Sequence, residues 1–198
     1  MTSDGLRSSR LSLRPWRDDD IELFAAINAD PEVMRWFPEP LERAGTEAMV
    51  ERVRAHHAEH GFGLWAVEVL GPAGPAPFVG FVGLAVPRWE PPFATTDPCV
   101  EIGWRLARPW WGLGIATEAA QLVLRDAFDV LGLEEVVSFT VPPNLPSQNV
   151  MQKLGMRYDG VFDHPLAPPG AWWRPHVLYR LDVDTWRAST EGSGRTSP

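Results

Sequence analysis

The chain of 198 residues has little of several features that would point to particular classes of protein. Cys99 is its only cysteine, so an internal disulfide is excluded, and we expect a reducing, cytoplasmic location. Lys and Arg number 18 against 26 Asp and Glu, and this net charge of −8 argues against a nucleic-acid partner. No apolar run has the length of a membrane span, and "MTSDGLRSSR" lacks the apolar centre of a signal peptide, so no membrane partner is expected.

What is present is typical of one globular α/β domain. Hydrophobic residues make up 44% and charged residues 22% of the chain, while the 20 prolines and 17 glycines are scattered and indicate many turns. The apolar patterns predict the order β-α-α-β-β-β-α-β-α-β-β. The predicted strands are 10–16, 64–70, 78–86, 99–106, 134–141, 156–163 and 176–184, and the predicted helices are 17–30, 46–60, 117–132 and 146–155.

The segment "ARPWWGLGIATEAA" joins a predicted strand to a predicted helix. Gly112 and Gly114 allow a group to approach the backbone closely, and free amides at the helix start would attract an anion. The segment is not a Walker A loop, because no Lys-Ser/Thr follows, and Thr117 stands where a dinucleotide fingerprint has its third glycine. A tight strand-to-helix turn with no ligand remains the alternative.

A second segment, "NLPSQNVMQKLGM" at 144–156, follows the next predicted strand. Together the two segments resemble the GCN5-related N-acetyltransferases (GNAT), whose pyrophosphate loop reads Gln/Arg-x-x-Gly-x-Gly/Ala. Trp111 stands in place of the Gln/Arg, a departure common in the RimJ/RimL-like branch that acetylates ribosomal-protein N-termini. "EIGWRLARPWWGLGIATEA" and "RLSLRPW" are similar to that branch as well, so the resemblance covers about residues 9–187.

The resemblance implies a fold and a domain plan. The GNAT fold is α/β, with a mixed, mostly antiparallel central sheet of about seven strands flanked by four helices. A splayed parallel strand pair in that sheet binds coenzyme A. We therefore expect an N-terminal extension over 1–8, an N-acetyltransferase domain over 9–187 and a disordered tail over 188–198.

The resemblance also implies acetyl-CoA as the acetyl donor. Its pyrophosphate is expected on the amides of the glycine turn, and its pantetheine arm is expected along the backbone of the preceding strand and beside Asn144. The expected cofactor-binding residues are Trp104, Leu106, Trp111, Gly112, Leu113, Gly114, Ile115, Ala116, Thr117, Asn144 and Asn149.

Direct acyl transfer needs a base for the amine and a proton donor for the leaving thiolate. Glu101, on the strand expected to hold the thioester, is the preferred base, with His164, His176 or water as alternatives. Met151 stands where the family has its tyrosine acid, so the resemblance moves that role to Ser147. The structural alternatives are that the Glu101 carboxylate only orients backbone groups and that Ser147 only belongs to the first turn of a helix.

The acceptor, a primary amine on a protein N-terminus or a small molecule, is expected to meet Trp36, Phe37, Trp172 and Trp173. The exposed pair Trp172 and Trp173 covers either this site or the same hairpin of a partner subunit in a homodimer. No metal is expected, because His56 and His60 have no third ligand at a suitable spacing. A non-catalytic acyl-CoA-binding domain and a nucleotide-binding enzyme are the rival hypotheses.

Overall fold

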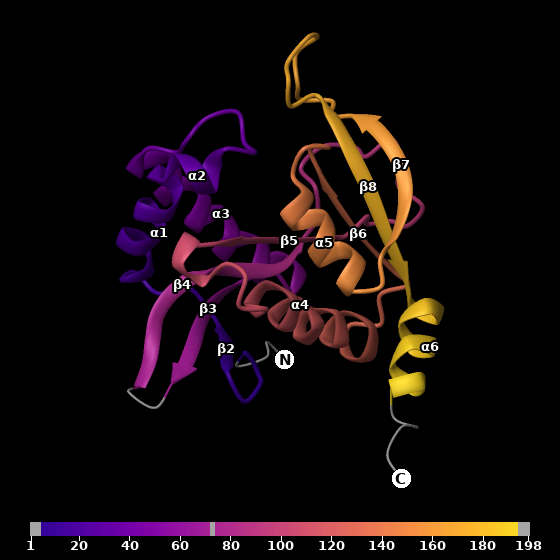
Figure 1. Cartoon of the computed structure of the whole chain (residues 1–198), viewed down its shortest axis with the longest axis horizontal. Coiled ribbons are helices and arrows are strands. Elements are labelled where there is room, and N and C mark those ends of the chain that lie inside the picture. The colour runs from indigo at the N-terminus through magenta and orange to yellow at the C-terminus, as the bar shows by residue number, and fades with distance from the viewer. Residues whose placement is uncertain (1–4, 72–73, 194–198) are drawn as a thin grey trace. The chain divides into compact units, whose positions relative to one another are not determined.

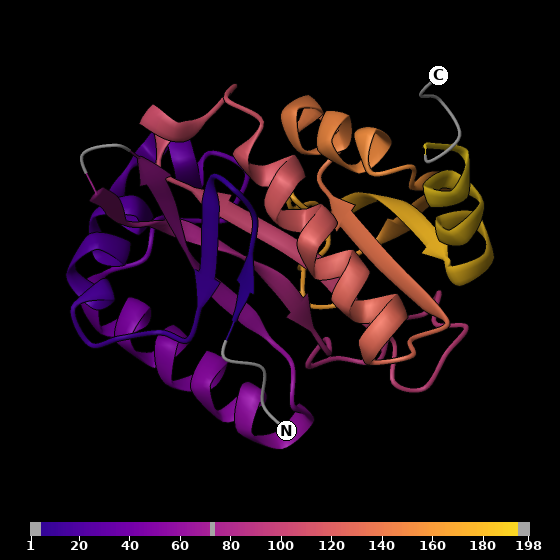
Figure 2. The ribbon, with the colours of Figure 1, turned by 90° about the horizontal axis from the view of Figure 1, so that it is seen from below.

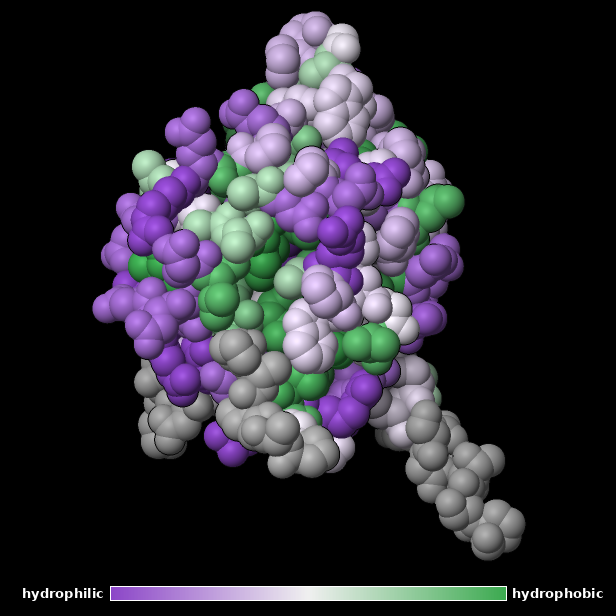
Figure 3. All heavy atoms as spheres, turned by 60° about the vertical axis from the view of Figure 1, so that its left-hand side comes forward, coloured by the Kyte–Doolittle hydropathy of each residue, from purple (hydrophilic) through white to green (hydrophobic). Residues whose placement is uncertain are grey.

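The residues that the computed structural model describes are 5–71 and 74–193. They group into two compact units, the first made of Met1–Ala85 with Ile102–Val123, the second of Val86–Glu101 with Leu124–Pro198. Figure 1 labels the α-helices of both units and all their strands except β1. Hydrophilic residues cover much of the face that is seen in Figure 3.

The first unit contains a mostly antiparallel run of strands with helices packed on it. The strands are hydrogen-bonded in the order β1 (Leu6–Arg7), β2 (Leu11–Arg14), β3 (Leu64–Gly71), β4 (Gly74–Ala85) and β5 (Glu101–Leu106), whose first residue counts with the second unit. The helices are α1 (Asp20–Ala29), α2 (Pro31–Met34), α3 (Arg43–His60), the 3₁₀ turn η1 (Arg108–Trp110) and α4 (Ile115–Arg125), whose last two residues count with the second unit. Helix α1 packs on β4, α2 and α3 (Figure 1).

Aromatic residues form the core of the first unit. Trp16 lies 5.1 Å from Phe24 and 5.0 Å from Phe78, measured between ring centroids, and Phe81 completes the group. The indole Nε1 of Trp16 donates to the carbonyl of Leu64 at 2.8 Å, so its one polar atom is satisfied inside the core.

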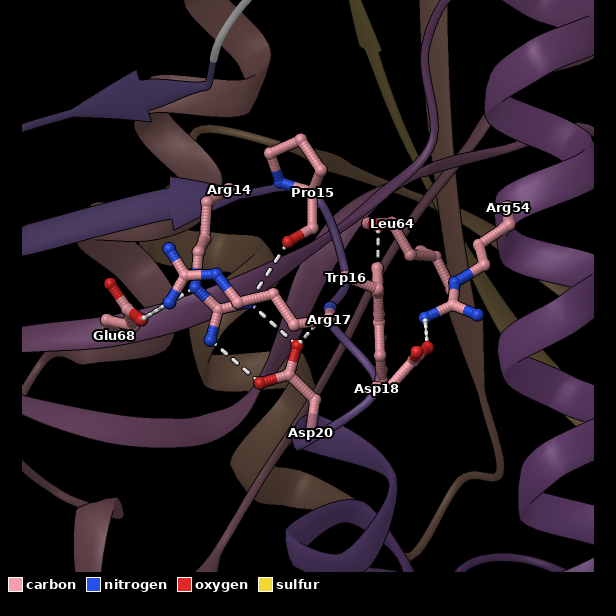
Figure 4. A network of polar contacts seen from close by, with 9 residues as sticks. All are labelled: Arg14, Pro15, Trp16, Arg17, Asp18, Asp20, Arg54, Leu64 and Glu68. Atoms are coloured by element: carbon pink, nitrogen blue, oxygen red, sulfur yellow. Dashed lines mark hydrogen bonds and ion pairs between the residues drawn. The ribbon is translucent and has the colours of Figure 1, made fainter.

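A buried ion pair closes this core near the start of α1 (Figure 4). Both Nη atoms of Arg14 bind the carboxylate of Asp20 at 2.7 Å, and its Nε donates to Glu68 at 2.6 Å. The backbone N–H of Arg17 donates to the same Asp20 carboxylate at 2.7 Å. The Arg14 charge is therefore fully compensated, which is what a buried guanidinium requires.

The second unit has three antiparallel strands in the order β6 (Glu135–Thr140), β8 (Pro175–Asp182), β7 (Arg157–Asp163). Glu101, the first residue of β5, pairs in parallel with Val137 of β6. A π-helical turn η2 (Asp126–Val130) ends α4, α5 (Leu145–Lys153) packs on β6, and α6 (Val183–Ser193) packs on β8 (Figure 2).

In the second unit, the side chain of Arg180 on β8 binds the long loop 86–100, which precedes β5. Its guanidinium pairs with Glu135 at 2.7 Å and with Asp159 at 2.5 Å. The same group donates to Thr95 Oγ1 at 3.1 Å and to the carbonyl of Phe93, both on that loop. The loop is thus tied to the sheet by one buried side chain.

The expected mixed α/β fold is confirmed, and the described residues hold eight strands and six α-helices rather than about seven and four. The parallel pairing of β5 with β6 is confirmed at Glu101, whereas the splaying of that pair stays a prediction. Strand β1 falls within the predicted extension 1–8. Strand β4 begins at Gly74, inside a predicted turn whose residues 72–73 lie outside the described residues.

Two helices occupy segments for which the sequence predicts none. Helix α2 lies in the predicted loop 31–43, because Asp30 caps it by accepting from Glu32 N–H at 2.9 Å and Pro31 fits its first turn. Helix α6 reaches Ser193, inside the predicted tail 188–198. Asp182 accepts from the N–H of Thr185 at its start and Trp186 packs on Phe128. Residues 194–198 of that tail lie outside the described residues.

Candidate functional site

The glycine turn lies in the first unit, where it follows β5 and leads into α4. After the 3₁₀ turn η1, the indole Nε1 of Trp111 donates to the carbonyl of Leu106 at 2.7 Å, while 42% of the Trp111 side chain is exposed. Gly112 and Gly114 then have φ values of +72° and +79°. A side chain at either position would be strained, so the turn depends on glycine.

The outer side of this turn is open. A Cβ atom built on Gly112 would meet nothing within 4 Å, and one on Gly114 would meet only Arg10 Nη2 at 3.8 Å. Leu113 between them is 53% exposed. The space beside the backbone amides is therefore free for a ligand, which fits the expected place of a pyrophosphate.

The start of α4 supplies donors to that space. The first helical hydrogen bond runs from Glu118 N–H to Gly114 O at 3.0 Å, so the amides of residues 115–117 have no partner within the helix. Arg10 borders the turn, since it donates to Leu113 O at 3.4 Å, and its charge is paired with the carboxylate of Glu118. The amides and the helix dipole together favour an anion.

In the second unit, Asn144 and Ser147 are brought together at the start of α5. Asn144 caps the helix by accepting from Ser147 N–H at 3.3 Å, and its Nδ2 donates to Thr140 Oγ1 at 2.9 Å and to Ser147 Oγ at 3.0 Å. Asn144 is 7% exposed, so its first role is structural. Ser147 is half-buried and accepts from Asn144, which leaves its hydroxyl proton available.

The other positions on α5 divide between surface and core. Asn149 is exposed. Met151 is 1% exposed, so the residue that stands in place of the family's tyrosine belongs to the core. Beneath the helix the hydroxyl of Tyr179 donates to Gln148 Oε1 and accepts from Gln152 Nε2, both at 3.3 Å. No motif in the sequence points to this tyrosine.

Glu101 has the electrostatics of a base near neutral pH. It is half-buried and pairs with Val137, and burial raises the pKa of its carboxyl to about 8. A carboxyl with such a pKa is only partly ionised at pH 7 and can both accept and return a proton. Cys99 precedes it by two residues, and burial raises the pKa of that thiol to about 11, so the thiol is protonated and no nucleophile.

The raised pKa of Glu101 predicts a pH dependence of stability. Between its ordinary value of 4.5 and about 8, the folded protein holds a proton that the unfolded chain releases. This contribution to stability is complete below about pH 4.5 and is lost as the pH rises through 8. We expect the wild-type Tm to fall relative to that of Glu101→Gln between pH 5 and 8.5. The exposed Glu90→Gln serves as control, and parallel Tm curves for wild type and Glu101→Gln would contradict the prediction.

His164 and His176 lie in an aromatic cluster of the second unit. Their ring centroids are 5.0 Å apart, and Phe162 and Phe139 lie 5.6 Å and 5.9 Å from His176. Burial lowers the pKa of both imidazoles, that of His176 to about 4. Both histidines are neutral at pH 7 and weakly basic, so Glu101 is the better matched base.

The expected acceptor residues divide between the two units. In the first unit Trp36 is half-buried beneath Arg35, and Phe37 lies over the guanidinium of Arg105, 4.1 Å from ring centroid to Cζ. In the second unit Trp172 is 52% exposed and Trp173 lies 5.8 Å from His164. Trp36 and Phe37 therefore each contact an arginine, and Trp173 contacts a histidine.

The histidines of α3 are packed rather than arranged around an ion. The rings of His56 and His60 are 4.4 Å apart, and His56 Nδ1 lies 3.0 Å from the carbonyl of Phe62. Across residues 5–71 and 74–193 no group of three His, Cys, Asp or Glu is placed to hold a metal ion. Within the same residues, no helix has both the length and the apolar character of a membrane span.

The glycine turn and the segment 144–156 both lie in the part of the chain that matches known proteins. A family model described as "Acetyltransferase (GNAT) domain" matches residues 10–157. The chain is 31% identical over 186 residues to the FsC-acetyl coenzyme A-N(2)-transacetylase of Aspergillus fumigatus, covering 91% of this chain and 77% of that protein. An acetyltransferase structure from Agrobacterium tumefaciens is 28% identical with a TM-score of 0.71, over 91% of this chain and 95% of that one. RimJ of Mycobacterium smegmatis, solved in complex with CoA-disulfide, is 24% identical with a TM-score of 0.68, over 92% and 89% of the two chains.

Proposed function

Because the chain belongs to the GNAT family of acetyltransferases, we propose that it transfers the acetyl group of acetyl-CoA to a primary amine by direct attack. The observation that carries the proposal is the turn at Gly112 and Gly114, which is open on its outer side and faces the free amides of α4. The protonated thiol of Cys99 supports direct attack, because it offers no nucleophile for a covalent intermediate.

The residues of the turn fit a CoA pyrophosphate. The amides of 112–117 would donate to its oxygens, and the Arg10 side chain, which is paired with Glu118, would border it. Trp104 and Leu106 would offer backbone groups to the pantetheine arm, although the Leu106 carbonyl already accepts from Trp111. Asn144 and Asn149 are the other residues proposed to bind the arm. When bound, acetyl-CoA supplies the activated acetyl thioester.

Glu101 would remove the proton that an amine of pKa about 10 carries at neutral pH. Its raised pKa makes the carboxylate a stronger base than an exposed glutamate, so the transfer from the ammonium is less uphill. Ser147 would donate its free hydroxyl proton to the departing sulfur, a hydrogen bond that stabilises thiolate charge. His176, with a pKa of about 4, is the weaker candidate base.

The acceptor would be a protein N-terminus, as in the RimJ/RimL-like branch, or a small-molecule amine. The resemblance of the glycine-turn segment to that branch supports the first, and the name of the relative FsC-acetyl coenzyme A-N(2)-transacetylase supports transfer to a nitrogen in either case. Trp36, Phe37, Trp172 and Trp173 would contact it, or the exposed Trp172 would join two subunits of a homodimer. The lone cysteine supports a cytoplasmic location.

A thiol-release assay with acetyl-CoA tests the proposal. The acceptor panel contains peptides with free N-termini, polyamines and aminoglycosides, and mass spectrometry checks each product for an added acetyl group. We expect CoA release that requires both enzyme and amine. A protein that binds acetyl-CoA yet releases no thiol with any amine would instead be a non-catalytic acyl-CoA-binding domain, a function that the core position of Met151 favours.

Replacing Ser147 by Ala separates proton donation from cofactor binding. If the hydroxyl assists the leaving sulfur, kcat falls by about tenfold while the KM for acetyl-CoA stays within about twofold. The helix start is expected to survive, because Asn144 keeps its bond to Thr140. A rise in KM with unchanged kcat would make Ser147 a cofactor ligand that protonates nothing.

A further inference from the structure

Arg105 on β5 is a buried cation without a carboxylate partner. Three arginines of the described chain are less than a tenth exposed: Arg14 at 7%, Arg105 at 8% and Arg180 at 9%. Arg14 and Arg180 each bind two carboxylates. At Arg105 burial alone lowers the pKa, to about 10, with no acidic neighbour to oppose it. A buried charge of this kind is costly and calls for an explanation.

The guanidinium of Arg105 is held in a fixed orientation by neutral groups. Its Nη1 donates to Asn28 Oδ1 at 2.6 Å, and Asn28 Nδ2 donates in turn to Thr46 Oγ1 at 3.0 Å. Asn28 and Thr46 are both fully buried, on α1 and α3. Asn28 and Thr46 therefore orient the Arg105 guanidinium. Both are uncharged, so neither neutralises its charge.

The opposite edge of the same guanidinium has an unpaired donor. The Nε atom is buried and has no hydrogen-bond partner. Because Nη1 donates to Asn28, the edge of the guanidinium that carries Nε and Nη2 is left for a ligand. The N–H groups on this edge are parallel, so they can bind both oxygens of a carboxylate. Phe37 covers the guanidinium face at 4.1 Å and is itself 37% exposed, so it lies between Arg105 and solvent.

We propose that Arg105, aimed by Asn28 and covered by Phe37, forms a subsite for a carboxylate group of the acceptor. A single guanidinium matches one negative charge, whereas a phosphate dianion would leave an uncompensated charge among Phe24, Phe37 and Phe81. The inference names the acceptor class, an amine that also carries a carboxylate, and so rests on the proposed acetyl transfer. The rival explanation is a purely structural tie from β5 to α1.

Carboxylate binding is tested first without any acetyl transfer. Thermal unfolding is measured in about 100 mM sodium propionate, propionamide, sodium phosphate or sodium chloride at equal ionic strength. We expect propionate to raise the wild-type Tm by about 3 °C over chloride, and to raise that of Arg105→Gln by less than a third of this. Arg17→Gln, which removes an exposed charge, is the matched control and keeps the full rise.

Two results would overturn the subsite. One is an equal propionate effect on wild type and Arg105→Gln, and the other is a phosphate or propionamide effect as large as that of propionate. If Arg105→Gln does not fold, Arg105→Lys decides, since it keeps the charge and loses the fork. A propionate shift in that variant equal to the wild-type shift would also contradict the proposal.

Acceptor selectivity is the second test. The dipeptide Ala-Phe and its C-terminal amide differ only in the carboxylate, and we expect wild-type kcat/KM to favour the free acid by about tenfold or more. Arg105→Gln is expected to bring that ratio close to one. If the enzyme acetylates both equally, or accepts only amines without a carboxylate, the inference fails while acetyl transfer stands. If nothing is acetylated, the proposed function fails and the propionate experiment still decides the subsite.

Discussion

Replacing Glu101 by Gln is expected to lower kcat at pH 7.5 by about 100-fold or more, with the affinity for acetyl-CoA changed by less than about threefold. Gln keeps the shape of the side chain and cannot accept a proton. Because burial raises the pKa of this carboxyl to about 8, its ionised form grows as the pH rises from 6 to 9. Glu101→Asp is the matched control, since it keeps a carboxylate and retains part of the rate.

The pH profile makes this prediction specific. Wild-type kcat/KM should rise with pH and level off above about 8, as Glu101 ionises. The acceptor amine ionises equally with both enzymes. Dividing the wild-type kcat/KM by that of Glu101→Gln therefore removes the contribution of the amine and leaves that of Glu101. A ratio near one at every pH would show that water, rather than Glu101, removes the proton.

Replacing Gly114 by Val is expected to weaken CoA binding by 100-fold or more. The backbone there has a φ of +79°, which a β-branched residue rarely adopts, and the new side chain would enter the open side of the turn where the pyrophosphate is expected. Isothermal calorimetry with CoA measures the loss. In thermal unfolding, acetyl-CoA near 100 times its Kd should stabilise the wild type by about 2.7 kcal/mol and the variant hardly at all.

Gly132 provides a matched control for this substitution. It has a φ of +69°, also with nothing within 4 Å of a Cβ, but lies after η2 in the second unit. Gly132→Val therefore imposes a similar backbone strain away from the turn and should bind CoA as the wild type does. Normal CoA binding by Gly114→Val would place the cofactor's phosphates elsewhere.

The regular elements were largely predictable from sequence, because their signals are local. The C-terminal end of α3 follows from Gly61, which adopts a φ of +75°, and β6 follows from its β-branched and aromatic residues. Helix α2 was missed because its four residues are too short for a periodic pattern. Helix α6 was missed because its segment is mainly polar and lacks an apolar helical periodicity. In the structure, one aromatic contact, between Trp186 and Phe128, holds it in place.

The candidate site was predictable where a motif lies within one short segment. The turn at Gly112 and Gly114 was found in this way, and its two positive φ values agree with the expectation. The contacts of Arg10 and Arg105 were not found, because they join residues 103 and 77 positions apart in the chain. The motif match likewise gave no sign that Asn144 already uses its side chain to cap α5.

Calorimetric titration of the wild-type protein with CoA and with 4′-phosphopantetheine tests the central claim most directly. The two ligands share the arm and its first phosphate, and only CoA has the second phosphate and the nucleotide. Binding through the amides of 112–117 predicts that CoA binds at least about 100-fold more tightly, and that neither ATP nor NAD displaces it. Equal affinities for the two ligands, or displacement of CoA by ATP or NAD, would contradict the account.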